Sequence, residues 1–275
     1  MNQNTHHYFG QADGMYVSTT DYGNNTVVGK YVTSNGARIY YEVYGQGTPI
    51  VLLHGGLVGS PAEMGELADH LKDNHQVILI ATRGHGRSEI GHTTMSFEQK
   101  ADDVHAVLKD ASIKDKVDVI GFSDGGYTGY YFAKQYPNEI NRLIAIGAGK
   151  WDKGFVQGGR QMIKTFTDLK GFDERYWNEQ LKDIRPESAR AEEWFNSLNT
   201  YYDSVEVGAD VFDAVKAKTL VLAGEKDANA PLQTVIDAYH LLPDAELGIV
   251  PNAPHPVLIT DFDQAWPMIE KFLAK

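Results

Sequence analysis

The sequence predicts an α/β fold in which helices cover both faces of a mostly parallel central sheet. Short apolar runs recur along the chain, and stretches with helical spacing alternate with them. Runs that are apolar at successive positions are typical of parallel strands buried on both faces. The chain has 275 residues, of which 42% are hydrophobic, and this composition suits a globular core.

Eight runs carry the strand pattern. In chain order they are Tyr31–Thr33, Arg38–Tyr44, Ile50–Leu53, Val77–Ile80, Val117–Phe122, Leu143–Ile146, Leu220–Ala223 and Leu247–Val250. The turn signal Ser34-Asn35-Gly36 separates the first two runs. Helical spacing predicts one helix from Pro61 to about Asp73 and another from Ser96, where Ser96 and Gln99 fit a capping box.

Three parts of the chain differ in character. Residues 1–29 are rich in Asn, Gly, Thr and Tyr and have little apolar periodicity, so we expect an arm that is flexible or wraps the surface. Residues 30–149 and 217–275 carry the alternating pattern of the core. Residues 150–216 interrupt it without a clear strand and hold eleven of the thirty aromatic side chains. Since this insertion leaves from the end of a strand, we expect a helical cap over the binding crevice.

Composition excludes several classes of protein. The net charge of −12 disfavours nucleic acid as a partner, because an acidic chain and a polyanion repel each other. No apolar stretch approaches the roughly 18 residues of a membrane span. There is no cysteine, and no His/Asp/Glu cluster has metal-ligand spacing, so neither a metal nor another cofactor is predicted. The first residues lack the pattern of an intact signal peptide; a cytoplasmic location and, if a leader has been removed, an exported one are both compatible with this. The sequence carries no signal of oligomeric state.

The segment Gly121-Phe122-Ser123-Asp124-Gly125 matches the G-x-S-x-G nucleophile elbow. In this motif a serine sits at the tip of a sharp turn between a strand and a helix, where neighbouring side chains would clash, so glycines flank it. An apolar run precedes the segment, and a helical pattern follows it up to Tyr136-Pro137. We therefore predict that Ser123 is a nucleophile.

A serine hydroxyl needs a base, and the base needs an anion to fix its tautomer. His255 lies in a proline-flanked loop after the last predicted strand, and Asp227 follows the strand at Leu220–Ala223. Glu225 is the nearest alternative to Asp227, which we prefer because it lies deeper in the loop. The order Ser123, Asp227, His255 is the one that this arrangement of strands imposes.

Acyl transfer also needs N–H donors for the developing oxyanion. The backbone amide of Asp124, at the start of the helix, is one candidate. The other is Gly56 in His54-Gly55-Gly56, with Leu57 as the alternative, and we expect the His54 ring to hold this loop. Leu57, Asp124 and Trp151 are candidate substrate contacts.

Taken together, these residues resemble the α/β-hydrolase fold superfamily, in its serine esterase-like branch with a helical cap. The resemblance rests on His54–Gly56, Arg83–Ser88, Gly121–Gly125, Gly224–Asp227 and Pro254-His255, and it covers about residues 30–275. It implies a Ser123–His255–Asp227 triad, with Gly56 and Asp124 as oxyanion donors. Related dehalogenases and epoxide hydrolases carry Asp at the tip of the elbow, so Ser123 disfavours both activities.

The resemblance predicts a carboxylesterase-like serine hydrolase that cleaves a small-molecule ester or amide through an acyl-enzyme. A carbon–carbon bond hydrolase, a perhydrolase and a non-enzymatic ligand receptor on the same fold are the alternatives. Asp124 adds a question, because a carboxylate beside the nucleophile would repel the developing oxyanion. Either it faces the pocket and recognises an amine, or it turns away and bonds nearby backbone.

Overall fold

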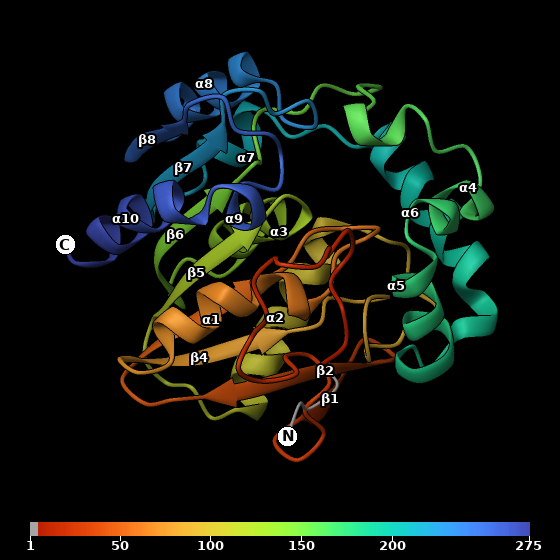
Figure 1. The fold of residues 1–275 in the computed structure, drawn as a ribbon. Coiled ribbons are helices and arrows are strands. Elements are labelled where there is room, and N and C mark those ends of the chain that lie inside the picture. Colours follow the sequence, from red (N-terminus) through yellow and green to blue (C-terminus); the bar gives the residue numbers. More distant parts are fainter. Residues whose placement is uncertain (1–4) are drawn as a thin grey trace.

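A single eight-stranded sheet forms the centre of the protein in this computed structural model, which describes residues 5–275 (Figure 1). The strands are β1 (Lys30–Ser34), β2 (Ala37–Tyr44), β3 (Thr48–Leu53), β4 (His75–Ile80), β5 (Val117–Phe122), β6 (Ile140–Ile146), β7 (Lys218–Gly224) and β8 (Ala245–Val250). Each of them contains or overlaps one of the eight runs predicted from the sequence.

The strands lie in the order β1-β2-β4-β3-β5-β6-β7-β8. The first two neighbouring pairs, β1–β2 and β2–β4, are antiparallel, and all the other neighbouring pairs are parallel. Parallel strands end at a common edge of the sheet, so the loops after β3, β5, β7 and β8 come together there.

Helices cover both faces of the sheet, as predicted. In β3, Ile50 and Leu52 face one hydrophobic cluster, while Val51 and Leu53 face the other. The cluster around Ile50 includes side chains of α1 (Gly65–Leu71), α9 (Val257–Thr260) and α10 (Phe262–Leu273). The other includes side chains of α2 (Phe97–Asp110), α3 (Asp124–Gln135) and α8 (Leu232–Leu241). Among residues 5–275, no helix has the length and apolar character needed to cross a membrane.

The long insertion between β6 and β7 is helical. It contains α4 (Phe166–Phe172), α5 (Glu174–Glu179), α6 (Ala191–Ser204) and α7 (Ala209–Phe212). Figure 1 shows α4, α5 and α6 standing apart from the sheet. By contrast, α7 returns to the core, where Phe212 packs edge-on against Tyr130 of α3 at 4.9 Å between ring centres. An isolated bridge between Trp151 and Val207 joins the two ends of the insertion.

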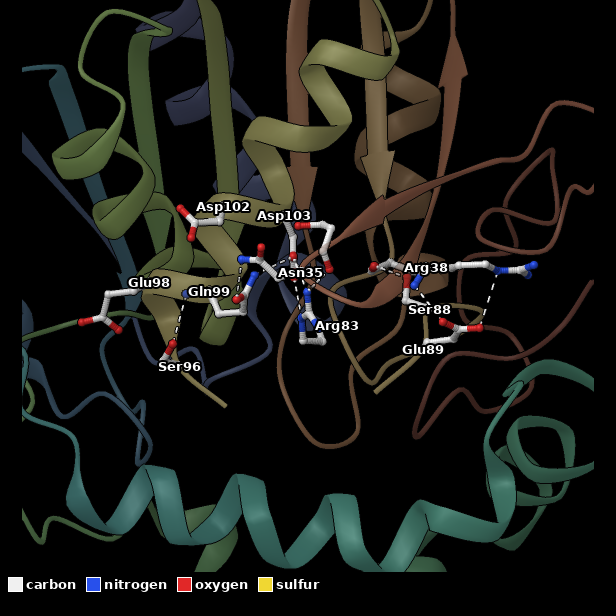
Figure 2. Close-up of polar contacts among 12 residues, drawn as sticks. Asn35, Arg38, Arg83, Ser88, Glu89, Ser96, Glu98, Gln99, Asp102 and Asp103 are labelled. Atoms are coloured by element: carbon white, nitrogen blue, oxygen red, sulfur yellow. Dashed lines mark hydrogen bonds and ion pairs between the residues drawn. The ribbon is translucent and has the colours of Figure 1, made fainter. Parts of the chain in front are cut away.

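Helix α2 begins at the predicted cap, but only half of the capping box forms. The Ser96 hydroxyl accepts a hydrogen bond from the Gln99 amide at 3.0 Å. The Gln99 side chain turns to other partners, since it accepts from Asn35 at 2.9 Å and donates to Asp103 at 3.0 Å (Figure 2). The side chain thus links the β1–β2 turn to α2 and does not return to the helix terminus.

A buried ion pair connects the loop after β4 to the same helix. Arg83 donates two hydrogen bonds to Asp103, at 2.9 and 2.7 Å, and a third to the Ser34 carbonyl at 2.7 Å (Figure 2). Both charged side chains are almost fully buried. Removing one partner would leave an uncompensated charge in the interior, which is more costly than losing the pair as a whole.

We therefore expect Asp103→Asn to destabilise the fold by about 3–5 kcal/mol, because the Arg83 charge stays buried. Glu98→Gln, an exposed position on the same helix, is the matched control and should change stability by less than about 0.5 kcal/mol. Urea unfolding followed by circular dichroism measures both free energies. Equal effects of the two substitutions would contradict the importance of the buried pair.

Candidate active site

Ser123 occupies a sharp turn between β5 and α3. Its backbone has φ 53° and ψ −117°, in the region that side chains rarely adopt. The Ser123 amide donates to the Ile146 carbonyl of the neighbouring strand at 2.7 Å, which fixes the turn to the sheet. The hydroxyl is thereby held at the edge where the parallel strands end.

Two glycines make this turn possible. A Cβ on Gly121 would come within 2.1 Å of the Gly125 carbonyl oxygen, and a Cβ on Gly125 within 2.2 Å of the Leu53 carbonyl oxygen. Both distances involve backbone atoms, which cannot move aside as a flexible side chain can. The spacing of glycines around Ser123 is therefore a steric requirement of the close approach between β5, α3 and the end of β3.

The three residues predicted as a triad lie within hydrogen-bonding distance of one another. His255 Nε2 is 2.9 Å from Ser123 Oγ, and His255 Nδ1 is 2.7 Å from Asp227 Oδ2. Ser123 follows β5, Asp227 follows β7 and His255 follows β8. The imidazole thus bridges a hydroxyl and a carboxylate that are far apart along the chain.

The Asp227 carboxylate is fixed on its other side. Its Oδ1 accepts the backbone amides of Asn229 and Ala230 at 2.8 and 2.7 Å, which leaves Oδ2 for the imidazole. Glu225, the alternative to Asp227, instead accepts the Asn252 amide at 2.7 Å and is partly exposed. Glu225 therefore contacts the loop that carries His255 and does not contact the imidazole itself.

Two backbone amides beside Ser123 remain available. Within residues 5–275, neither the Gly56 nor the Asp124 amide donates a hydrogen bond to another group of the protein. Both residues line the cavity that contains Ser123, and so does Leu57, the alternative donor, which has φ 54°. Amides without a partner at this edge of the sheet can bind an oxyanion.

His54 holds the loop after β3. The Thr82 amide donates to its Nε2 at 3.0 Å, so the proton lies on Nδ1, which contacts the Gly55 carbonyl at 2.7 Å. Burial lowers the pKa of His54 to about 4, so the ring is neutral near pH 7. This agrees with the loop-holding function expected from the sequence.

Glu63 was not singled out from the sequence, yet its carboxyl lines the same cavity. It accepts a hydrogen bond from the Gly55 amide. Burial raises the pKa of Glu63 to about 7, and the nearby Asp124 charge raises it further, while the Gly55 amide opposes the shift. Since no local pattern marks this position, only the folded structure brings it to the site.

The Asp124 carboxylate has two side-chain partners, not the backbone partners expected if it turned away from the pocket. Lys100 of α2 donates to both of its oxygens, at 2.6 and 2.7 Å, and the Tyr202 hydroxyl of α6 donates to Oδ2. Lys100 and Asp124 are both buried. Because the carboxylate already has an ammonium partner, it does not need a substrate amine to balance its charge.

The cavity next to Ser123 has a volume of about 510 Å³. All three candidate substrate contacts, Leu57, Asp124 and Trp151, line it. Its charged side chains have internal partners, since Arg160 pairs with Asp203 at 2.6 Å and Asp124 pairs with Lys100. No group of three or more metal-ligating side chains occurs among residues 5–275. The space is therefore mostly apolar and suits a neutral ligand.

Comparison with known proteins identifies the fold. The profile of the alpha/beta hydrolase fold family matches residues 48–181. The solved structure of the meta-cleavage product hydrolase from Pseudomonas fluorescens IP01 superimposes with a TM-score of 0.77 and 19% identity, covering 91% of this chain and 99% of that one. The chain therefore has the α/β-hydrolase fold.

Two further relatives agree with this. The serine hydrolase BPHL of Mus musculus is 24% identical over 254 residues, which cover 88% of this chain and 85% of that protein. The enol-lactonase from Burkholderia xenovorans LB400 gives a TM-score of 0.74 at 19% identity, covering 90% of this chain and all of that one. Hydrolases thus recur among the proteins that this chain resembles.

The raised pKa of Glu63 predicts a pH-dependent effect of Glu63→Gln on stability. The protonated carboxyl is the form that the fold favours, so its contribution is complete below about pH 4.5 and is lost as the pH rises to about 7. Gln keeps an acceptor for the Gly55 amide without the charge. The difference in Tm, variant minus wild type, should therefore be more positive at about pH 8 than at about pH 5.

Thermal unfolding at the two pH values measures this difference. Glu192→Gln, on the exposed face of α6, is the control and should show no change of sign or size with pH. A Glu63→Gln variant that is equally destabilised at both pH values would contradict the assignment of an easily protonated carboxyl at this position.

Proposed function

We propose that this protein is a serine hydrolase that cleaves a neutral small-molecule ester through an acyl-enzyme. The observation that carries the proposal is the continuous chain of hydrogen bonds from Ser123 Oγ through His255 to Asp227 at the wall of an apolar cavity. An enol-lactonase is among the proteins with a similar fold, and a lactone is an ester. No cofactor is needed for this chemistry.

In the first half of the reaction, Ser123 Oγ attacks the ester carbonyl carbon while His255 Nε2 takes the hydroxyl proton. The new carbon–oxygen bond converts the carbonyl oxygen into an oxyanion. His255 then gives the proton to the alcohol oxygen as the old carbon–oxygen bond breaks. Asp227 keeps the imidazole in the correct tautomer and stabilises its charged form.

The Gly56 and Asp124 amides bind the oxyanion in this proposal. Removing one such donor typically slows a reaction of this kind by roughly 10²–10³-fold. The Asp124 side chain would oppose this stabilisation if its charge were free, but Lys100 neutralises it at 2.6 Å. The same residue can thus supply a donor through its backbone without repelling the oxyanion through its side chain.

The second half of the reaction reverses the roles. A water molecule gives its proton to His255 and attacks the acyl carbon, and the proton then returns to Ser123 Oγ as the acid leaves. The insertion at residues 150–216 acts as a cap that shapes the space for the substrate. Trp151 and Leu57 contact the apolar part of the substrate. An acidic substrate would need a free cation in the lining, and Arg160 is already paired.

A fluorophosphonate probe tests the nucleophile directly. We expect a single covalent adduct on Ser123, located by peptide mass spectrometry, and no adduct in Ser123→Ala.

Asp227→Asn should lower kcat/KM for a p-nitrophenyl ester by about 10⁴-fold, because the imidazole then adopts the wrong tautomer.

Glu225→Gln is the matched control for Asp227→Asn, since it removes the neighbouring carboxylate of the same loop. It should retain most of the wild-type activity, because Glu225 bonds the Asn252 amide, whereas the His255 imidazole bonds Asp227. An adduct on another residue, or equal losses in the two carboxylate variants, would refute the proposed triad.

A further inference from the structure

We infer that the N-terminal arm, residues 5–29, supplies one wall of the active-site cavity, and that Phe9 and Met15 limit the length of the apolar group it accepts. Phe9, Gly10 and Met15 line the same cavity as Ser123. All three lie outside residues 48–181, the part of the chain that matches the family profile. The inference rests on the proposed function, because it concerns which esters reach Ser123.

The arm is fastened to the insertion by several specific contacts. His7 contacts Glu179 of α5 through both its backbone amide and its Nδ1, at 2.8 and 2.6 Å. The Gly10 amide donates to Asp173 at 2.8 Å. Phe9 packs edge-on against Tyr176 at 5.7 Å between ring centres. Phe9 therefore lies between the helix α5 and the cavity.

A second set of contacts fastens the arm to the core. The Asp69 carboxylate of α1 accepts the Tyr16 hydroxyl at 2.8 Å, the Thr19 amide at 3.0 Å and the Tyr22 hydroxyl at 2.7 Å. Further along, buried Glu42 of β2 accepts the Gly23 and Asn25 amides at 3.0 and 2.9 Å. The arm is thus held on both sides of Met15.

Local turns place the two apolar side chains on the same wall. The Gln11 amide donates to the Tyr8 carbonyl at 3.1 Å, and the Met15 amide donates to the Ala12 carbonyl at 3.2 Å. These turns fold the segment back on itself between its anchors. Because the arm is held at both ends, Phe9 and Met15 cannot leave the cavity wall without breaking contacts to α5 or Asp69. They therefore set a fixed limit to the length of the cavity.

A series of alkyl fluorophosphonates of increasing chain length tests the limit. In wild type, the rate of adduct formation on Ser123 should fall sharply beyond a certain length. Phe9→Ala and Met15→Ala should move this fall to longer chains and raise the ratio of long-chain to short-chain labelling by about tenfold, the size expected for one or two methylene groups in an apolar pocket. Phe9→Trp should move it to shorter chains.

Val17→Ala is the matched control, because Val17 belongs to the same arm but is 61% exposed and does not line the cavity. Its labelling profile should equal that of wild type. Thermal unfolding of each variant checks that it is folded. A profile unchanged in both alanine variants and in Phe9→Trp, with normal labelling of Ser123, would overturn the inference.

Failure of the proposed function gives a different result. In that case wild type itself would carry no adduct on Ser123 at any chain length. The effect of the arm on the cavity can then be tested without a reaction. Calorimetry would measure the affinity of the Ser123→Ala variant for p-nitrophenyl octanoate and for p-nitrophenyl butyrate. Phe9→Ala in that background should strengthen binding of the longer ester relative to the shorter one, and an unchanged ratio would again overturn the inference.

Discussion

The left-handed backbone of Ser123 is the constraint around which the candidate active-site edge of the sheet is arranged. A serine at φ 53° is unfavourable in isolation and persists only where the surroundings hold it. Here β6 accepts its amide and α3 begins at the next residue. The absence of a Cβ at Gly121 and Gly125 lets the strand, the helix and the end of β3 approach closely enough to do so.

His255 also packs closely against the backbone of this region. Gly147 follows β6 with φ 63°, and a Cβ there would come within 3.0 Å of His255 Cε1 and 3.3 Å of Asp227 Oδ2. The imidazole therefore rests directly against the backbone just after β6. The ring also lies near Phe122, at 4.9 Å between ring centres. Contacts with Gly147 and Phe122 restrict the ring to orientations that keep Nε2 near Ser123.

The elements of the core could be predicted because each leaves a local signal. The strands are buried on both faces, so their sequences are short apolar runs, and the predicted nucleophile, acid and base each follow one of these runs. The order of the residues in the chain then placed them at one edge of the sheet. For this reason the sequence alone predicts Ser123, Asp227 and His255 at one edge of the sheet, together with the loop at Gly56.

The partners of Asp124 could not be predicted in this way, because Lys100 and Tyr202 are distant in the chain and come from different elements. One signal was present: Lys100 stands in the apolar stripe of α2, beside Phe97, Ala101 and Val104, where a charged side chain is expected to have a buried partner. The identity of that partner depends on how α2 packs against α3, and no pattern within α2 encodes it. Glu63 carries no comparable signal.

The arm illustrates a further limit of pattern reading. It contains no helix or strand between residues 5 and 29, so it has no periodicity from which a position could be inferred. Ordering such a segment costs roughly 1–2 kcal/mol per residue in backbone entropy. Its order therefore requires many separate contacts, and they converge on two carboxylates, Asp69 and Glu42, each of which accepts several hydrogen bonds. Because both anchors belong to the core and a third set of contacts belongs to α5, the arm ties the insertion to the sheet across the wall of the cavity. In the proposed function, the chemistry thus depends on the core, whereas the shape of the substrate space depends on the arm and the insertion.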